Sequence, residues 1–235
     1  MRKIVLSLLL ATFGLLPATI FAQSVDLIWE ADTYVPPLYK GLPLWTNESD
    51  VTFVAIPHLP SVNTSTLIYR WSKNGTILGS LSGVNKRSLT ISDTVLSEPV
   101  EITIDVFEDN GASPLASRKA RLTPSSAKLV IVEDSPLQGL LLNRAMKQEF
   151  ILSKDEVTFS AIPFFATVST RLAGALEYNW TTGTGDKRSG NSVTYRIPQE
   201  GKGFTSITLK SNDSKMIVQP KPINFLIKFN KETSL

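Results

Sequence analysis

The chain contains one histidine, His58, and no cysteine. Ser-His-Asp and Cys-His nucleophiles, histidine-based zinc sites and thiol redox centres all need one or both of these residue types at specific positions. His58 follows Pro57 at the end of an apolar run, where a loop residue is the simplest interpretation. The composition therefore argues against most enzyme classes, and it predicts a chain with no catalytic residues, no metal and no cofactor.

Paired carboxylates are the remaining candidates for catalysis, because two of them at a suitable distance can cleave a glycosidic bond. Three pairs are close in the sequence: Glu30 with Asp32, Glu133 with Asp134, and Asp155 with Glu156. Adjacent residues on a strand point to opposite faces, which weakens the last two pairs. A carbohydrate-active enzyme with paired carboxylates is therefore the least favoured of three functional interpretations.

A stretch rich in aromatic residues and proline extends from Tyr34 to Tyr39, between two tryptophans. Exposed together, these rings would form a platform for a polysaccharide or a peptide. The candidate binding residues are Trp29, Tyr34, Tyr39 and Trp45.

These residues belong to a chain that repeats itself. The segment from Val51 to Pro57 returns as the segment from Val157 to Pro163, and Tyr69-Arg70-Trp71 returns as Tyr178-Asn179-Trp180. The repeat replaces His58 by Phe164, which supports a loop role for the histidine. Two homologous modules of about 100 residues are each large enough for a core of their own.

Short segments of alternating apolar and polar residues, separated by turns such as Asn74-Gly75, predict antiparallel β-strands in both modules. The fold class is therefore all-β, with two tandem Ig-like antiparallel sandwiches at residues 23–124 and 125–229. A short Pro-Ser-Ser-Ala linker begins at Pro124, and residues 230–235 form a flexible tail. The predicted core residues are Trp71, Trp180, Tyr69, Tyr178, Phe53 and Phe159.

The repeat also relates the aromatic stretch to a second segment. Residues 34–40 occupy the place of residues 136–142, where leucines replace the aromatic residues. This exchange favours an alternative to the binding platform, in which both stretches cover the open end of a sandwich. Residues 137–146 are expected to form one short helix or a covered loop.

The Tyr-x-Trp strand followed by a turn with glycine resembles the corresponding region of PKD-like and bacterial Ig-like domains. In such a sandwich one tryptophan per module fills the space between the sheets. The turns at 72–75 and 181–186 depart from the full PKD pattern, which has an acidic-aromatic-Gly-Asp-Gly turn.

The mature chain is also similar to exported, uncharacterised proteins of candidate-phylum (Patescibacteria or Parcubacteria-like) bacteria. The matching segments are residues 26–32, residues 34–41, the Val-Ala-Ile-Pro strand at 54–57, and the Glu-Asp-x-Pro-Leu segment that begins at Glu133. The resemblance implies tandem Ig-like domains at the cell surface and no assigned chemistry.

The N-terminus has the pattern of a signal peptide. Arg2 and Lys3 precede an apolar run that ends near Ala22, where we expect cleavage, so the signal peptide is 1–22. An uncleaved membrane anchor is the alternative, because the run is nearly long enough to span a bilayer. The predicted location is outside the cytoplasm: the cell surface, the periplasm or the extracellular space.

Charge is divided unevenly. Residues 24–124 contain 8 basic and 11 acidic residues, a net charge of −3, whereas residues 125–235 contain 14 basic and 10 acidic residues, a net charge of +4. This asymmetry favours head-to-tail association or contact with an anionic surface, with a scatter of solvated charges as the alternative. The nearly neutral mature chain gives no indication of nucleic-acid binding.

These observations predict an exported, non-catalytic structural or adhesive module that binds a protein or polysaccharide of the cell envelope. Contact with the membrane is expected only through an uncleaved signal segment. An accessory subunit of a pilus or another envelope assembly is the alternative, because the edge of a sheet can be completed by a partner strand.

Overall fold

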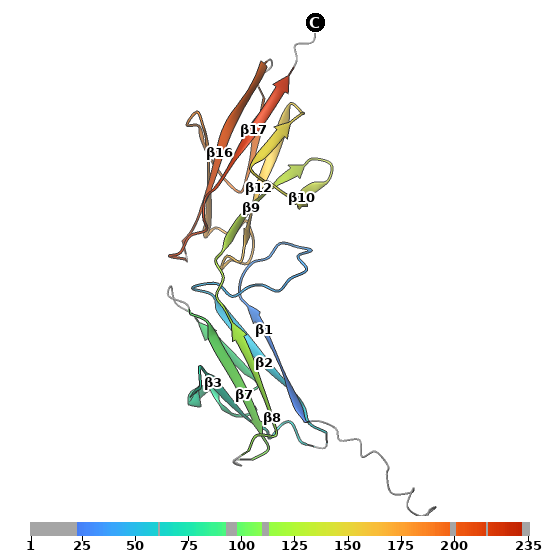
Figure 1. Cartoon of the computed structure of the whole chain (residues 1–235), viewed down its shortest axis with the longest axis vertical. Helices are drawn as coiled ribbons and strands as arrows, with labels where there is room; N and C mark the ends of the chain where they lie inside the picture. Colours follow the sequence, from blue (N-terminus) through green and yellow to red (C-terminus); the bar gives the residue numbers. More distant parts are fainter. Residues whose placement is uncertain are drawn as a thin grey trace, which may run out of the picture.

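The computed structural model describes residues 23–60, 62–92, 98–109, 113–197, 201–214 and 216–231. Within these ranges the chain forms strands and one short 3-10 helix, arranged as two modules that stand end to end (Figure 1). The predicted signal peptide, residues 1–22, lies outside the described residues, as do residues 232–235 of the predicted tail. The last strand extends to Lys231, two residues beyond the predicted end of the second module.

The first module is an antiparallel sandwich of two sheets. One sheet has the strand order β1-β2-β6 and the other the order β4-β3-β7-β8, with β5 paired to β3. The chain passes from one sheet to the other after β2, after β5 and after β6, as in an Ig-like sandwich. The bounds are β1 (Ser24–Ala31), β2 (Asp50–His58), β3 (Ile68–Lys73), β4 (Thr76–Ile77), η1 (Gly79–Leu81), β5 (Gly83–Val84), β6 (Ser88–Ser92), β7 (Val100–Phe107) and β8 (Ala116–Leu122).

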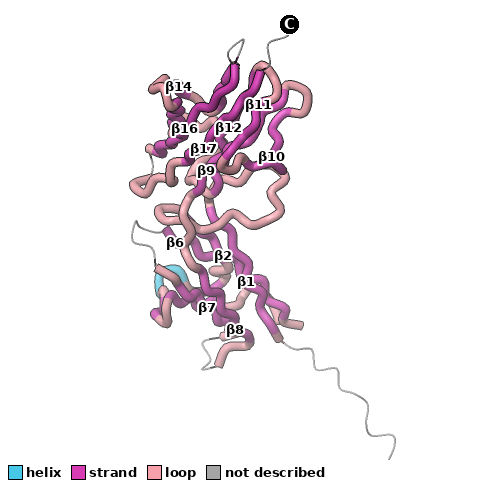
Figure 2. The backbone as a smooth tube through the Cα atoms, turned by 45° about the horizontal axis from the view of Figure 1, so that its top comes forward, coloured by secondary structure: helices cyan, strands magenta, loops and turns pink. Residues whose placement is uncertain are grey.

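The second module repeats this arrangement with additional strands. Its sheets have the orders β10-β9-β12-β15 and β11-β17-β16-β13-β14, and β11 pairs with β17 in parallel (Figure 2). The bounds are β9 (Lys128–Ser135), β10 (Gly139–Ala145), β11 (Glu149–Leu152), β12 (Glu156–Phe164), β13 (Leu176–Thr182), β14 (Lys187–Ser189), β15 (Ser192–Arg196), β16 (Gly201–Asp213) and β17 (Ile223–Lys231).

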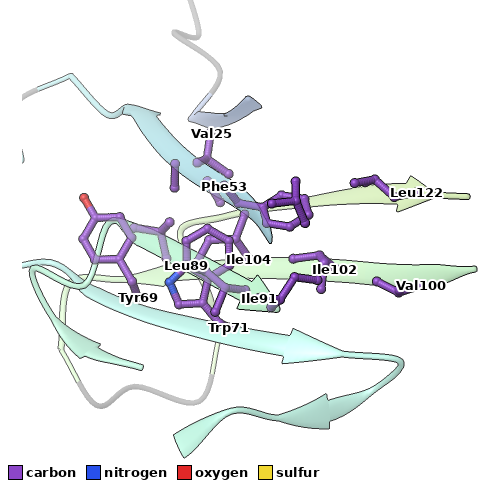
Figure 3. Close-up of a cluster of buried hydrophobic side chains, with 14 of the residues drawn as sticks. Val25, Phe53, Tyr69, Trp71, Leu89, Ile91, Val100, Ile102, Ile104 and Leu122 are labelled. Carbon is purple, nitrogen blue, oxygen red and sulfur yellow. The ribbon is translucent and has the colours of Figure 1, made fainter. Parts of the chain in front are cut away.

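Alternation along the strands decides which side chains enter each core. In β2 the buried residues are Val51, Phe53 and Ala55, and the residues between them face outward. Trp71 lies in the centre of the first core, beside Leu89 and Ile104 (Figure 3). Because a tryptophan fills the space between two sheets, this position fixes their separation.

The repeat seen in the sequence extends to individual hydrogen bonds. Trp71 Nε1 donates to the carbonyl oxygen of Lys86 at 2.8 Å, and Trp180 Nε1 donates to that of Gly190 at 2.8 Å. A pair of threonine hydroxyls also joins the same two strands in each module, Thr52 with Thr90 and Thr158 with Thr194. The six side chains assigned to the cores from the sequence are all buried: Phe53, Tyr69, Trp71, Phe159, Tyr178 and Trp180.

Two expectations about local structure need correction. Residues 137–146 form neither a helix nor a simple loop, because β10 folds back along β9 with Gly139 opposite Ser135. Gly139 has a φ of 68°, a conformation that glycine adopts without steric cost and that allows the turn. His58 is the last residue of β2 and does not lie in a loop, and its counterpart Phe164 is the last residue of β12.

Candidate functional site

The largest difference between the modules is the segment between their first two long strands. In the second module, this segment returns to its own sheets as β10 and β11. In the first module, residues 32–49 lie against the second module, below β10 in Figure 1, and we call these residues the docking loop. Segments at equivalent sequence positions therefore meet in space at the junction of the modules.

The docking loop is fixed to the first module at its C-terminal end. Trp45 is only 1% exposed and belongs to the core of the first module. Thr33 Oγ1 donates to the carbonyl oxygen of Leu44 at 2.9 Å. Ser49 Oγ donates to the carbonyl oxygen of Thr46 at 2.8 Å and accepts from its N–H at 3.0 Å. Trp45 therefore anchors the loop to the first core, and the hydrogen bonds within the loop hold its shape.

Backbone hydrogen bonds join the docking loop to the second module. The Tyr34 N–H donates to the carbonyl oxygen of Ala166 at 2.8 Å, and the Phe165 N–H donates to that of Tyr34 at 2.7 Å. Thr46 Oγ1 adds a bond to the carbonyl oxygen of Phe165 at 3.2 Å. Each such bond contributes about 0.5–1.5 kcal/mol, and together they fix the register of the loop.

A carboxylate and the linker add further contacts at the junction. Glu48 Oε2 accepts the N–H groups of Ile217 and Val218 at 2.7 and 3.2 Å, in the loop between β16 and β17. In the linker, the Ser125 N–H donates to the carbonyl oxygen of Trp45 at 2.8 Å. The first module therefore contacts the second at three separate places, which limits rotation between them.

Aromatic side chains fill the space between these polar contacts. Tyr34 packs against the core of the second module. The ring centroid of Tyr39 lies 5.5 Å from that of Phe164 and 6.1 Å from that of Phe165, both in edge-to-face geometry. A Cβ atom at Gly41 would lie 2.7 Å from the Tyr39 ring, so glycine is the residue that leaves room for this ring.

An apolar groove of about 570 Å³ opens between the docking loop and the outer face of β9, β10 and β12. Its size is within the range of known ligand sites, which are mostly apolar with a few polar groups. Lys40, Asn143 and the hydroxyl of Tyr39 supply polar groups, and the lining residues other than Lys40 and Asn143 are apolar or aromatic. They are Pro36, Pro37, Leu38, Tyr39, Val130, Val132, Leu140, Leu142, Ala145, Ile162 and Phe164.

The four aromatic residues selected from the sequence lie in different environments. Trp29 is half-buried against the core of the first module, and Trp45 lies within that core. Tyr34 is half-buried against the second module, whereas Tyr39 is 40% exposed and lines the groove. The structure therefore places one of the four, Tyr39, in the groove, and the four do not share one exposed surface.

The second module supplies groove residues that the sequence reasoning missed. Val130 and Val132 belong to the continuous apolar run Leu129–Val132. An alternating pattern would place only one face of this strand in the core, but here both faces are apolar. A continuous apolar run is typical of a strand that is covered on both faces. This run was therefore the feature of the sequence that could have indicated a covered outer face at β9. Phe164 and Phe165 replace His58 and Leu59 of the first copy, which marks a site where the modules differ.

The carboxylate pairs are not brought together in a cleft. Glu30 lines a shallow cavity on the first module without Asp32, and Glu133 lines one on the second module without Asp134. Glu156 instead forms an ion pair with Arg196, whose Nε lies 2.7 Å from Glu156 Oε2. In the described part of the chain, no group of three or more His, Cys, Asp or Glu residues is placed to hold a metal ion.

Buried tyrosines make the fold sensitive to high pH. Burial raises the pKa of Tyr178 to about 12 and that of Tyr195 to about 12, the latter against the opposing charge of Arg188. Burial also raises the pKa of Tyr34, against the opposing charge of Arg171. Tyr178 Oη donates to the carbonyl oxygen of Arg171 at 3.0 Å, whereas Tyr195 Oη has no hydrogen-bond partner among the described residues.

We expect the contribution of these tyrosines to the free energy of unfolding to be fully present below about pH 10 and to be lost between about pH 10 and 12. An unfolded tyrosine ionises near pH 10, so in this window the unfolded chain binds fewer protons than the native chain. Each unit of pKa difference corresponds to about 1.4 kcal/mol. Urea unfolding at pH 8 and pH 11 measures the loss, and Tyr195→Phe should reduce it because phenylalanine cannot ionise. An equal loss in Tyr195→Phe would contradict this assignment.

Comparisons with known proteins give no family. No protein-family model matches the chain, and no curated protein matches its sequence. Among solved structures, the chain is similar to the three N-terminal domains of the bacteriophage RB49 highly immunogenic outer capsid protein (Hoc). The identity is 15% and the TM-score 0.45, and the match covers 88% of this chain and 59% of the Hoc chain. No helix in the described residues is long and apolar enough to cross a membrane.

Proposed function

We propose that the chain is an exported, non-catalytic binding module with a structural or adhesive role at the cell surface. The observation that carries the proposal is the groove between the modules. Neither module forms this groove alone, because one wall is the docking loop and the other is the sheet of β9, β10 and β12. The signal-peptide pattern of residues 1–22 supports export.

The lining of the groove supports binding without turnover. Its walls are mostly apolar, and its polar groups are the side-chain nitrogen of Lys40, the amide of Asn143 and the hydroxyl of Tyr39. None of the described residues that line the groove is a histidine, cysteine, aspartate or glutamate. An apolar segment of an envelope protein, or the apolar face of a sugar stacked on Tyr39, fits such a lining.

The junction supports a structural role for the same molecule. Several hydrogen bonds and a cluster of aromatic rings join the two modules. Modules joined in this way transmit force and hold a ligand at a fixed distance from either end of the pair. The docking loop thereby couples the two roles, since it both fixes the junction and forms the wall of the groove.

Leu140→Glu in the mature chain from Gln23 is expected to abolish capture of the ligand from envelope extract and from a panel of envelope polysaccharides. Leu140 is half-buried and lines the groove, so a carboxylate there would face apolar walls. Leu137→Glu is the matched control, because Leu137 is 96% exposed in the same hairpin and does not line the groove. Thermal melting checks that both variants fold.

The proposal requires that the Leu137→Glu variant capture the same ligand as the natural chain. Equal capture by both variants would place binding outside the groove. Release of a modified polysaccharide fragment during the incubation would contradict the non-catalytic role and favour the carbohydrate-active alternative.

A further inference from the structure

Two shallow apolar hollows lie on the outer faces of sheets in different modules. The first, which we call the acidic hollow, is about 570 Å³ and is lined by Leu27, Ile28, Trp29, Glu30, Leu42, Thr52 and Val54. The second, which we call the basic hollow, is about 490 Å³ and is lined by Ile151, Lys202, Gly203, Phe204, Lys228 and Phe229. Neither hollow includes a residue of the groove described above.

Both hollows expose large apolar side chains. Ile28 is 52% exposed and Leu42 is 58% exposed in the acidic hollow. In the basic hollow, Phe204 is 72% exposed and Ile151 is 75% exposed. A single exposed apolar residue is ordinary on a protein surface, but several gathered on one sheet face are typical of an interaction site.

The charges around the two hollows are opposite. The strands β1, β2 and β6 contain three acidic residues, Asp26, Glu30 and Asp50, and no lysine or arginine. On the other face, Lys202 and Lys210 of β16 and Lys228 of β17 are exposed, and Ile151 stands opposite Lys228. The two hollows therefore lie on sheet faces that carry charges of opposite sign.

One charge in each hollow is available for a partner. Asp26 is paired with His58 at 2.9 Å, and Lys228 is paired with Glu149 at 2.8 Å. Within the described residues, the side chains of Glu30 and Lys202 form no ion pair. An apolar hollow with a free carboxylate and an apolar hollow with a free ammonium are complementary in both respects.

We propose that copies of this chain associate head to tail, with the acidic hollow of one copy against the basic hollow of the next. Such a contact is heterologous, because the two surfaces that meet are different, and a pair of copies keeps one unused acidic hollow and one unused basic hollow. Association therefore continues beyond a dimer and gives chains of copies. The proposal goes beyond the ligand-binding role and does not depend on the groove.

Sedimentation velocity of the mature chain tests this association over a range of protein concentrations. We expect the average mass to rise with concentration beyond that of a dimer, and to fall when salt is added, because the contact contains opposed charges. Glu30→Lys and Lys202→Glu should each weaken association by about three- to tenfold. Lys210→Glu is the matched control, since Lys210 lies on the same strand as Lys202 but outside the basic hollow.

Mixing the two charge-reversed variants gives the decisive result. The Glu30→Lys variant keeps the basic hollow and the Lys202→Glu variant keeps the acidic hollow, so the mixture restores the natural contact. The two reversed charges have opposite signs in the other contact, so the mixture should associate more strongly than either variant alone. A chain that stays monomeric at low salt would overturn the proposal. So would a closed dimer, or an equal loss of association in Lys210→Glu.

A monomer that instead binds vesicles of anionic lipid through Phe204 would assign the basic hollow to a membrane surface, and would also overturn the proposal. The Leu140→Glu variant should associate like the natural chain, because Leu140 lies in neither hollow. The Leu140→Glu variant therefore tests ligand binding in the groove, and the Glu30→Lys and Lys202→Glu variants test self-association, so the two properties can fail separately.

Discussion

Trp180→Ala is expected to lower the free energy of unfolding of the second module by about 3–5 kcal/mol. The indole is fully buried, and its removal leaves both a cavity between the sheets and an unpaired carbonyl oxygen at Gly190. Such a loss is a large part of the stability of a domain of this size, so the second module is expected to be partly unfolded at 37 °C.

Hydrogen exchange measured by mass spectrometry locates this effect. Amides of β13 and β16 should lose protection in Trp180→Ala, whereas amides of β3 and β7 in the first module should keep most of theirs. Trp71→Ala is the reciprocal control, because Trp71 has the equivalent position and the equivalent hydrogen bond. Equal loss of protection in both modules for either variant would contradict two separate cores.

Tyr34→Ala is expected to destabilise the second module, although Tyr34 belongs to the first. Its half-buried ring packs against the core of the second module, so we expect a loss of about 1–3 kcal/mol, below the full cost of a buried aromatic residue. For a domain of about 100 residues, each kcal/mol lowers the melting temperature by about 4–8 °C. Calorimetry should show that the transition of the second module moves to a lower temperature.

Leu38→Ala is the control for this variant. Leu38 lies in the same docking loop but is 92% exposed, so its removal should change the melting temperature little. Both residues are replaced by alanine, so they differ mainly in contact with the second module. If Tyr34→Ala instead destabilises the first module alone, the ring contributes to its own module and the junction is weaker than described.

The sequence was most informative where alternation and repetition agree. Both copies place Tyr-x-Trp on a strand with period two, so Trp71 and Trp180 could be assigned to cores without a structure. The pattern also predicted two modules, because the core tryptophan of each copy requires two sheets around it.

The junction could not be obtained in the same way. A repeat predicts that residues 34–40 and 136–142 have equivalent local positions, but the two segments fold differently. Residues 139–145 pair with β9 of their own module. The backbone of Tyr34 instead forms hydrogen bonds with Phe165 and Ala166, which are more than a hundred residues away in the sequence. Contacts between distant segments leave no periodicity in the sequence.

The environment of the candidate aromatic residues depends on the same tertiary contacts. Trp45 and Tyr39 are six positions apart, yet one is buried in the first core and the other is 40% exposed beside Phe164. Hydrophobicity is high at both positions, so it does not separate them. The contact between the docking loop and the second module determines how exposed Tyr39 is. The same contact determines the position of the groove.

The central claim is that the docking loop fixes the two modules as one body. Because the chain has no cysteine, Arg118→Cys and Lys210→Cys introduce two unique sites for spin labels, one in each module. We expect pulsed electron paramagnetic resonance to give one narrow distance distribution, which becomes broad when Tyr34→Ala and Glu48→Ala are added. A broad distribution in the chain with its natural docking loop would contradict the claim.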